Sequence, residues 1–250
     1  MIHSAATTKN VEVYDEFWGL CPDFLKYNPG VRHRRRWLLR TLQQCGAGTA
    51  LDVGCGTGEL LRWLRPQVPS VREWSGVDLS AKTIASNREH DHGATYEPLN
   101  IDEGALPRRF DAVICTEVIE HLGQPDQAMK NLFAMVEPGG HLLLTCPTGK
   151  VHATERHWGH TVHPTPEGLR GLVEGAGFTV KALENWGFPF FLALKYATNV
   201  SPEFAMSKFA SGTYSAKAKA VSTALYLANF LNVPSSRLGC QLFALAQRPR

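Results

Sequence analysis

The chain has 250 residues, 44% of them hydrophobic, and a formal net charge of +3. A chain of this length buries enough apolar surface for a stable core without disulfide or metal staples, so we expect one domain with or without a cap. The small net charge argues against nucleic acid or an anionic membrane as partner. The six cysteines form no CxxC pair, which favours reduced core thiols in a cytoplasmic protein over a disulfide framework or a zinc site.

The N-terminal segment, residues 1–46, is predicted to form a helical cap ahead of the first strand. The pattern from about Val11 to Gln44 is helical and includes several aromatic side chains. The basic run Arg32–Arg36 is interpreted as a solvated helix face in preference to an anion site. We expect neither a secretory signal peptide nor a membrane span, because no apolar run is long enough.

A glycine-rich turn follows the first predicted strand, Thr49–Val53. Gly54, Gly56 and Gly58 let the backbone turn tightly and let a ligand approach closely, because they lack a Cβ atom. In a dinucleotide fingerprint a further glycine would stand where this chain has Glu59, whose acidic side chain would repel a pyrophosphate. The turn therefore predicts a nucleotide-type ligand other than a dinucleotide.

The second predicted strand, Trp74–Val77, runs directly into Asp78. An acid at the end of the second strand, about twenty residues past the glycine turn, is where a nucleotide-type site holds ribose hydroxyls. The carboxyl ends of parallel strands meet at one edge of a sheet, so Asp78 and the turn are expected to lie together. These features predict an adenosine-containing cofactor at that edge.

The remaining core alternates strands and helices, a pattern typical of a parallel sheet with helices on both faces. Further strands are expected over Ala94–Leu99, Phe110–Cys115, His141–Cys146, Phe178–Leu183 and Leu238–Ala246. Helices are expected over Glu59–Leu64, Ala81–Glu89, Asp126–Val136 and Glu167–Ala176.

The connection between the last two strands, residues 188–234, is long enough to carry structure of its own. Its apolar segments, Phe188–Tyr196 and Ala220–Leu231, have helical spacing and predict an amphipathic lid over the sheet edge. Ordinary packing explains these segments better than docking to a membrane surface. We therefore divide the chain into the cap, 1–46, and a catalytic domain, 47–250, that includes this lid.

Several segments together resemble class I S-adenosylmethionine-dependent methyltransferases, in that family's order and separations. They are LDVGCGTG, GVDLS, FDAVICTEVIEHL (110–122), VEPGGHLLLTCP (136–147) and HPTPEGLRGLVEGAGFTV (163–180). The most similar branch contains ubiquinone-biosynthesis O-methyltransferases and other small-molecule methyltransferases. The resemblance implies an α/β fold with a Rossmann-like, doubly wound, seven-stranded sheet whose last strand is antiparallel. It also implies S-adenosyl-L-methionine as cofactor and a small-molecule acceptor, such as a hydroxyl of a secondary metabolite, quinone or glycan.

The resemblance implies roles for residues around the cofactor's methionine and ribose. Gly54, Gly56 and Gly58 would lie beneath both parts. Asp52 would hold the methionine ammonium, directly or through water. Asp78 would accept hydrogen bonds from both ribose hydroxyls, since a carboxylate has two accepting oxygens.

The adenine and the sulfonium have their own implied residues. Leu79 would pack on the adenine ring. Asn100 with Ile101 would contact its edge where the family commonly has an aspartate, and Asp102 is the alternative if the register shifts by two. The sulfonium would be flanked by the residues that end the fourth strand, Thr116 and Glu117.

An oxygen acceptor needs its proton removed, and a general base contributes about 10²–10⁴-fold. The candidates are His121, His157 and His160, with His163 close by. His121 follows Glu120 at the start of a helix, where a structural hydrogen bond is an equal alternative. His157 and His160 lie in an irregular loop after the fifth strand, the kind of place where chemistry is usually located.

The same region suggests a metal set, because Glu117, Glu120 and His121 form an ExxEH motif and His160 follows. This combination resembles the ligands of small-RNA 3′-terminal 2′-O-methyltransferases and suits a divalent ion. The motif also occurs in metal-free relatives, so a metal is an alternative and not the expectation. The chain lacks a broad basic face outside Arg32–Arg36, which argues against RNA. The rival functions are methylation of a macromolecule and cofactor binding without methylation; the oligomeric state is not indicated.

Overall fold

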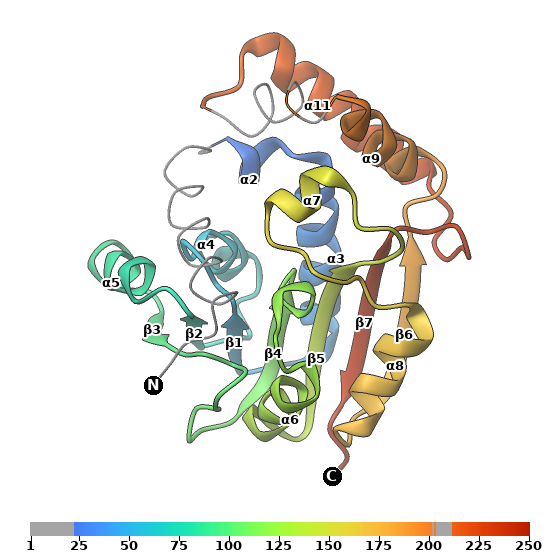
Figure 1. The fold of residues 1–250 in the computed structure, drawn as a ribbon. Helices are drawn as coiled ribbons and strands as arrows, with labels where there is room; N and C mark the ends of the chain where they lie inside the picture. Colours follow the sequence, from blue (N-terminus) through green and yellow to red (C-terminus); the bar gives the residue numbers. More distant parts are fainter. Residues whose placement is uncertain (1–22, 202, 204–211) are drawn as a thin grey trace.

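The computed structural model describes residues 23–201, 203 and 212–250, which form one seven-stranded sheet flanked by helices (Figure 1). The strand order is β3-β2-β1-β4-β5-β7-β6. The strands are β1 (Thr49–Val53), β2 (Glu73–Asp78), β3 (Thr95–Pro98), β4 (Phe110–Thr116), β5 (Val136–Pro147), β6 (Thr179–Trp186) and β7 (Gln241–Gln247). Strand β7 is antiparallel to β5 and β6, while β3, β2, β1, β4 and β5 run parallel. The predicted doubly wound sheet with an antiparallel last strand is confirmed.

Two apolar clusters cover the two faces of the sheet. One lies under α6 (Pro125–Met135) and α8 (Pro166–Gly175), with Met129, Leu132 and Leu169 fully buried. The other lies under α3 (Pro29–Cys45), α4 (Glu59–Leu64) and α5 (Ala81–His90), with Leu42, Leu61 and Ile84 at its centre. Central strands contribute to both clusters, which explains their continuous apolar runs.

Strand β5 is longer than predicted. It begins at Val136 and not at the predicted His141, so the Pro138–Gly140 segment lies inside the strand. Gly139 has a φ of +83°, and the pairing with β4 shifts register between Phe110 and Ala112. The irregularity is a local bulge, which a glycine with positive φ permits.

The N-terminal cap is not one continuous helix. Helix α2 (Phe24–Tyr27) ends at Asn28, whose side chain accepts hydrogen bonds from the amides of Gly30 and Val31 at the start of α3. Pro29 occupies the first turn of α3, where its missing N–H costs nothing. The predicted helix from Val11 is therefore broken at Asn28, and its part before residue 23 lies outside the described residues.

The insertion between β6 and β7 forms α9 (Phe190–Val200), α11 (Ala216–Ala228) and the short 3-10 turn η3 (Asn229–Leu231). Figure 1 shows α9 and α11 beyond the strand ends, near α2 and α7 (Ala153–His157). Helix α11 packs against α3 and α2. No helix in the described part of the chain is long and apolar enough to cross a membrane.

The basic run at the start of α3 is not a solvated face, and that interpretation is wrong. Arg35 is buried and pairs with Glu59 at 3.2 Å. The ring of His33 stacks on that of Trp186 with 3.9 Å between centroids. Glu59 lies on α4 and Trp186 ends β6, so the basic run connects α3 to both elements. The run also contacts the insertion, because Arg32 lies over the ring of Tyr226 and Arg36 lies over the ring of Phe230.

Candidate cofactor and acceptor site

A cavity of about 370 Å³ opens where β1, β2 and β4 end. Helices α2 and α3 form another part of its wall. Among the predicted site residues, the cavity is lined by Asp52, Gly54, Asp78, Leu79, Asn100, Ile101, Thr116, Glu117, His121 and His160. The lining does not include Gly56, Gly58, His157 and His163, nor Glu120 of the alternative metal set.

The glycine turn after β1 has a backbone that only glycine adopts without strain. The φ angles of Gly54, Gly56 and Gly58 are +74°, +48° and +72°. A Cβ on Gly54 would lie 2.5 Å from a methyl carbon of Val118, and one on Gly58 would lie 2.6 Å from the hydroxyl of Tyr96. The turn is therefore closed to side chains, which keeps backbone at the cavity wall.

Asp78 at the end of β2 holds the turn as well as facing the cavity. Its Oδ2 accepts a hydrogen bond from the amide of Gly56 at 2.8 Å, and its Oδ1 accepts one from the amide of Ser80 at 2.9 Å. These two bonds fix the carboxylate where β2 ends, at the cavity wall.

Asp52, at the end of β1, is a buried carboxyl that faces the cavity. It is 2% exposed, and its Oδ1 has no hydrogen-bond partner among the described residues. Burial and the nearby charge of Asp78 raise its pKa to about 8. A buried polar atom without a partner is uncommon in a folded protein, and a cationic ligand group in the cavity would satisfy it.

The predicted adenine-edge residues lie in one loop after β3. The side chain of Asn100 accepts from the amide of Asp102 and donates to Glu103. The two oxygens of Asp102 accept the amides of Gly123 and Gln124, at 2.9 and 3.1 Å. Both residues line the cavity, and the choice between them stays a prediction.

Glu117, which follows β4, is held by three elements. Its φ is +55°, a strained value for a residue with a side chain. Its Oε1 accepts from Thr145 on β5 and Gln241 on β7, both at 2.9 Å, and its Oε2 pairs with Arg34 of α3 at 3.3 Å. Both oxygens of the Glu117 carboxylate therefore have partners within the protein, and neither needs a metal ion as its partner.

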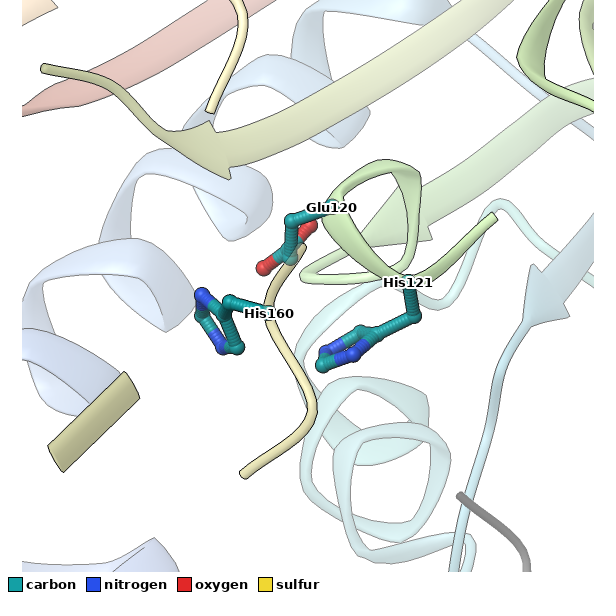
Figure 2. A group of neighbouring side chains, drawn as sticks. All are labelled: Glu120, His121 and His160. Carbon is teal, nitrogen blue, oxygen red and sulfur yellow. The ribbon is translucent and has the colours of Figure 1, made fainter. Parts of the chain in front are cut away.

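A cluster of ligating groups lies beside Glu117. Figure 2 shows Glu120 and His121, from the turn after β4, directed toward His160 from the segment after α7. One ligand atom from each lies within 4.8 Å of the others. A second such group, made of Glu155, His160 and His163, shares His160. Glu117, part of the predicted metal set, belongs to neither group in the described residues.

Glu120 is the unusual member of this cluster. It is fully buried, and neither carboxyl oxygen has a hydrogen-bond partner in the part of the chain that the structure describes. Burial and the charge of Glu117 raise its pKa well above the ordinary value. One carboxylate and two imidazoles are a donor set that zinc and similar divalent ions accept, so these residues fit a metal.

The two histidines at the cavity are neutral. Burial lowers the pKa of His121 to about 4, against a backbone hydrogen bond with Gly159 and the charge of Glu117, which raise it. Burial and then the charges of His121 and His163 lower the pKa of His160 to about 2. Their rings meet edge-on, 4.7 Å apart between centroids. A neutral imidazole has one nitrogen with a free lone pair, which can accept a proton or bind a metal.

His157 lies differently from His160. It is exposed and its ring contacts that of Trp158 at 5.1 Å, while Trp158 itself lines the cavity. Arg34 and Arg35 of α3 also line the cavity, although sequence analysis did not predict them there. No local pattern identifies them, because an arginine on a helix has the same sequence signal whether it faces solvent or an acid on another element.

Comparison with known proteins agrees with this architecture. A family model described as "Methyltransferase domain" matches residues 31–183. The ubiquinone biosynthesis O-methyltransferase of Dechloromonas aromatica is 30% identical over 115 residues, which are 44% of this chain and 48% of that protein. The matched region spans 48% of that protein and 59% of the ubiquinone biosynthesis O-methyltransferase of Pseudomonas fluorescens (strain Pf0-1), and less of some other curated relatives.

Solved structures share the fold at low identity. The N-methyltransferase NodS from Bradyrhizobium japonicum, in complex with S-adenosyl-L-homocysteine, is 19% identical with a TM-score of 0.59, covering 95% of this chain and 99% of that one. The [4+2]-cyclase SpnF is 18% identical with a TM-score of 0.56, covering 85% and 80%. The chain has their strand-and-helix architecture, and by its family match it belongs to the class I S-adenosylmethionine-dependent methyltransferases.

Proposed function

We propose that this protein binds S-adenosyl-L-methionine in the cavity and transfers its methyl group to a small-molecule acceptor, a hydroxyl in the first instance. The observation that carries the proposal is Asp52, which lines the cavity and whose buried Oδ1 has no partner among the described residues. The ammonium of the cofactor's methionine is the charge that this oxygen would accept. Asp78, at the end of the neighbouring strand, would accept the ribose hydroxyls.

The chemistry requires alignment more than covalent help. The bound cofactor supplies an activated methyl group on sulfur. The protein's own contribution would be to hold the acceptor oxygen beside the activated methyl group, a proximity effect worth up to about 7–11 kcal/mol. With the cofactor bound, His160 at the cavity wall would take the hydroxyl proton as the methyl group leaves the sulfur, and His121 would be the alternative base.

The acceptor side of the cavity favours a small, partly apolar molecule. Phe24, Leu25 and Val31 from the cap line it, together with Trp158. An aromatic wall of this kind stacks on planar rings. The ubiquinone O-methyltransferase names of the relatives support an oxygen acceptor, while the N-methyltransferase name of NodS keeps nitrogen as an outcome of the test.

The test combines binding and turnover. Calorimetry with S-adenosylmethionine and with NAD checks the cofactor, and preferential binding of NAD would refute the proposal. Turnover is measured as S-adenosylhomocysteine released in the presence of catechols, phenols, amines and simple sugars, with the methylated product identified by mass spectrometry. Cofactor binding without release of S-adenosylhomocysteine for any acceptor would favour a non-methylating role. SpnF, which is named a cyclase, shares the fold.

A divalent metal at Glu120, His121 and His160 is the second candidate feature of the site. Its support is the fully buried Glu120, whose carboxyl oxygens lack partners among the described residues. A bound ion would supply Lewis-acid polarisation of an acceptor oxygen. Metal content by plasma mass spectrometry should then be close to one ion per chain in the wild type and lost in Glu120→Gln. Equal metal content in the two proteins, or full activity after chelation, would exclude this role.

A further inference from the structure

His160 forms a hydrogen bond with His163, a residue that does not line the cavity. Its Nδ1 lies 2.9 Å from Nε2 of His163, whose side chain is fully buried. The two rings share one proton along this bond, so Nε2 is the nitrogen of His160 left for the cavity. The backbone amide of His160 also donates to the carbonyl of Glu155 at 3.1 Å. The position and the orientation of His160 therefore depend on His163 and Glu155.

Glu155 is held in turn by the insertion. Its Oε1 pairs with Nζ of Lys195 on α9 at 2.8 Å, and both side chains are largely buried, 16% and 11% exposed. Its Oε2 accepts the amide of His152 at 2.8 Å and lies 4.0 Å from Nε2 of His163. Removing one partner of a buried ion pair leaves the charge of the other uncompensated. The loss of Lys195 would therefore leave the carboxylate of Glu155 buried without its cationic partner.

Helix α9 contacts the same segment at two further points. Asn199 Oδ1 accepts hydrogen bonds from the amide and the hydroxyl of Thr154, at 3.2 and 2.9 Å. The ring of Tyr196 meets that of His152 edge-on at 5.0 Å. Helix α9 of the insertion therefore contacts α7, the element that precedes His160, through several side chains.

The sequence predicts that the insertion forms a lid over the sheet edge, yet none of its described residues lines the cavity. Its contacts with α7 give it a different way to act on the reaction. Proton transfer and metal ligation both need the imidazole held to about 0.5 Å. A side-chain network that sets the ring's angle and tautomer therefore controls the chemistry from outside the cavity.

We propose that Lys195 and Asn199 of α9 are positioning residues, which hold α7 through Glu155 and Thr154 so that His163 keeps His160 in one tautomer. In that tautomer the proton of His160 lies on Nδ1 and is donated to His163, and a bare Nε2 faces the acceptor. The inference rests on the proposed methyl transfer for the role of Nε2. The network itself is made of contacts between described residues.

The first arm of the test reads the His160 ring directly and needs no acceptor. The full chain, labelled with ¹⁵N-histidine and saturated with S-adenosylhomocysteine, is compared by two-bond ¹H–¹⁵N spectroscopy, with His160→Gln to assign the signals. Wild type should show one neutral His160 tautomer protonated at Nδ1. Lys195→Met should show a mixture of tautomers, and Lys195→Arg should restore the wild-type pattern. Lys217→Met, an exposed lysine on α11, is the matched control and should change nothing.

The second arm measures turnover with the acceptor found in the panel above. Lys195→Met should lower kcat about 10-fold, with the KM for cofactor changed less than twofold. If Lys195→Met loses S-adenosylhomocysteine binding, Asn199→Ala, which removes no charge, replaces it in both arms. A single Nδ1-protonated tautomer in both variants, or a wild-type His160 protonated at Nε2, would overturn the inference. If wild type methylates nothing yet the tautomer shifts, the proposed function fails while the positioning network stands.

Discussion

The part of the cavity proposed to bind the cofactor (the cofactor side) and the part proposed to bind the acceptor (the acceptor side) are built in different ways. On the cofactor side, backbone groups at neighbouring strand ends make the contacts, as where Asp78 binds the amide of Gly56. On the acceptor side, side chains from distant elements meet, as where Glu117 joins Arg34 and Gln241, which lies 124 residues away. The difference teaches that one half of a site can be specified by local conformation and the other half only by packing.

Gly54→Val is the sharpest way to break the cofactor side and should have the largest effect. The φ of +74° and the short approach to Val118 leave no room for a branched side chain. We expect binding of S-adenosylmethionine to be lost in calorimetry, with a free energy of unfolding lower by about 2 kcal/mol or more. Gly171→Ala, in α8 with open space around its Cβ position, is the control and should retain binding. Wild-type affinity in Gly54→Val would remove the turn from the site.

His160→Gln tests the acceptor side alone. If His160 is the base, kcat should fall by about 10²-fold or more, because a general base contributes on that scale. Cofactor affinity should stay within about twofold, since the cofactor contacts proposed here lie on the other side of the cavity. His157→Gln, at the exposed C-terminal end of α7, where the sequence predicts an irregular loop, is the matched variant and should keep nearly full activity. A reversed result would move the chemistry to His157.

Asp78→Asn sharpens the comparison by weakening the cofactor side without closing it. The amide keeps the shape but loses charge and one acceptor, so the affinity for S-adenosylmethionine should fall by about 10- to 100-fold, the cost of a charge-assisted hydrogen bond. With saturating cofactor, kcat should change little. Asp126→Asn, an exposed acid at the start of α6, controls for the loss of charge. Unchanged affinity in Asp78→Asn would contradict its role at the ribose.

The smallest effect is expected from His33, which packs between α3 and the insertion side of the sheet. Burial, and then the charges of Arg36 and Arg34, lower its pKa to about 4 from 6.5. Because the folded state disfavours its protonation, this stability is present above pH 6.5 and is lost as the pH falls toward 4. The loss should be on the order of 2 kcal/mol, allowing for partial exposure.

Urea unfolding at pH 7 and pH 4.5 measures this loss. His33→Phe keeps a ring against Trp186 but has no proton to bind. It should therefore lose less stability between the two pH values than the wild type does. An equal loss in the two proteins would assign the acid sensitivity to other groups, such as His121 and His160.

Much of the fold and of the cofactor side could be predicted from the sequence. The alternation of apolar runs and amphipathic helices indicated the layers, because a strand covered on both faces has to be apolar throughout. The position of the glycine turn, Asp52 and Asp78 at the strand ends could be predicted because it depends on spacing and on backbone angles that few residues adopt, while their contacts with the cofactor stay a prediction. The exceptions were local, such as the break at Asn28 and the early start of β5, where capping and a bulge changed the boundaries.

The sequence by itself therefore determined the sheet, the turn and the family to which the chain belongs. Only the tertiary structure decided the neighbours of side chains. It turned Arg34 and Arg35 from an expected solvated face into partners of Glu117 and Glu59, and it placed Trp158 rather than His157 at the cavity. The physical reason is that backbone conformation follows from nearby residues, whereas an ion pair or a ring contact depends on which distant element packs alongside, and no local pattern encodes that.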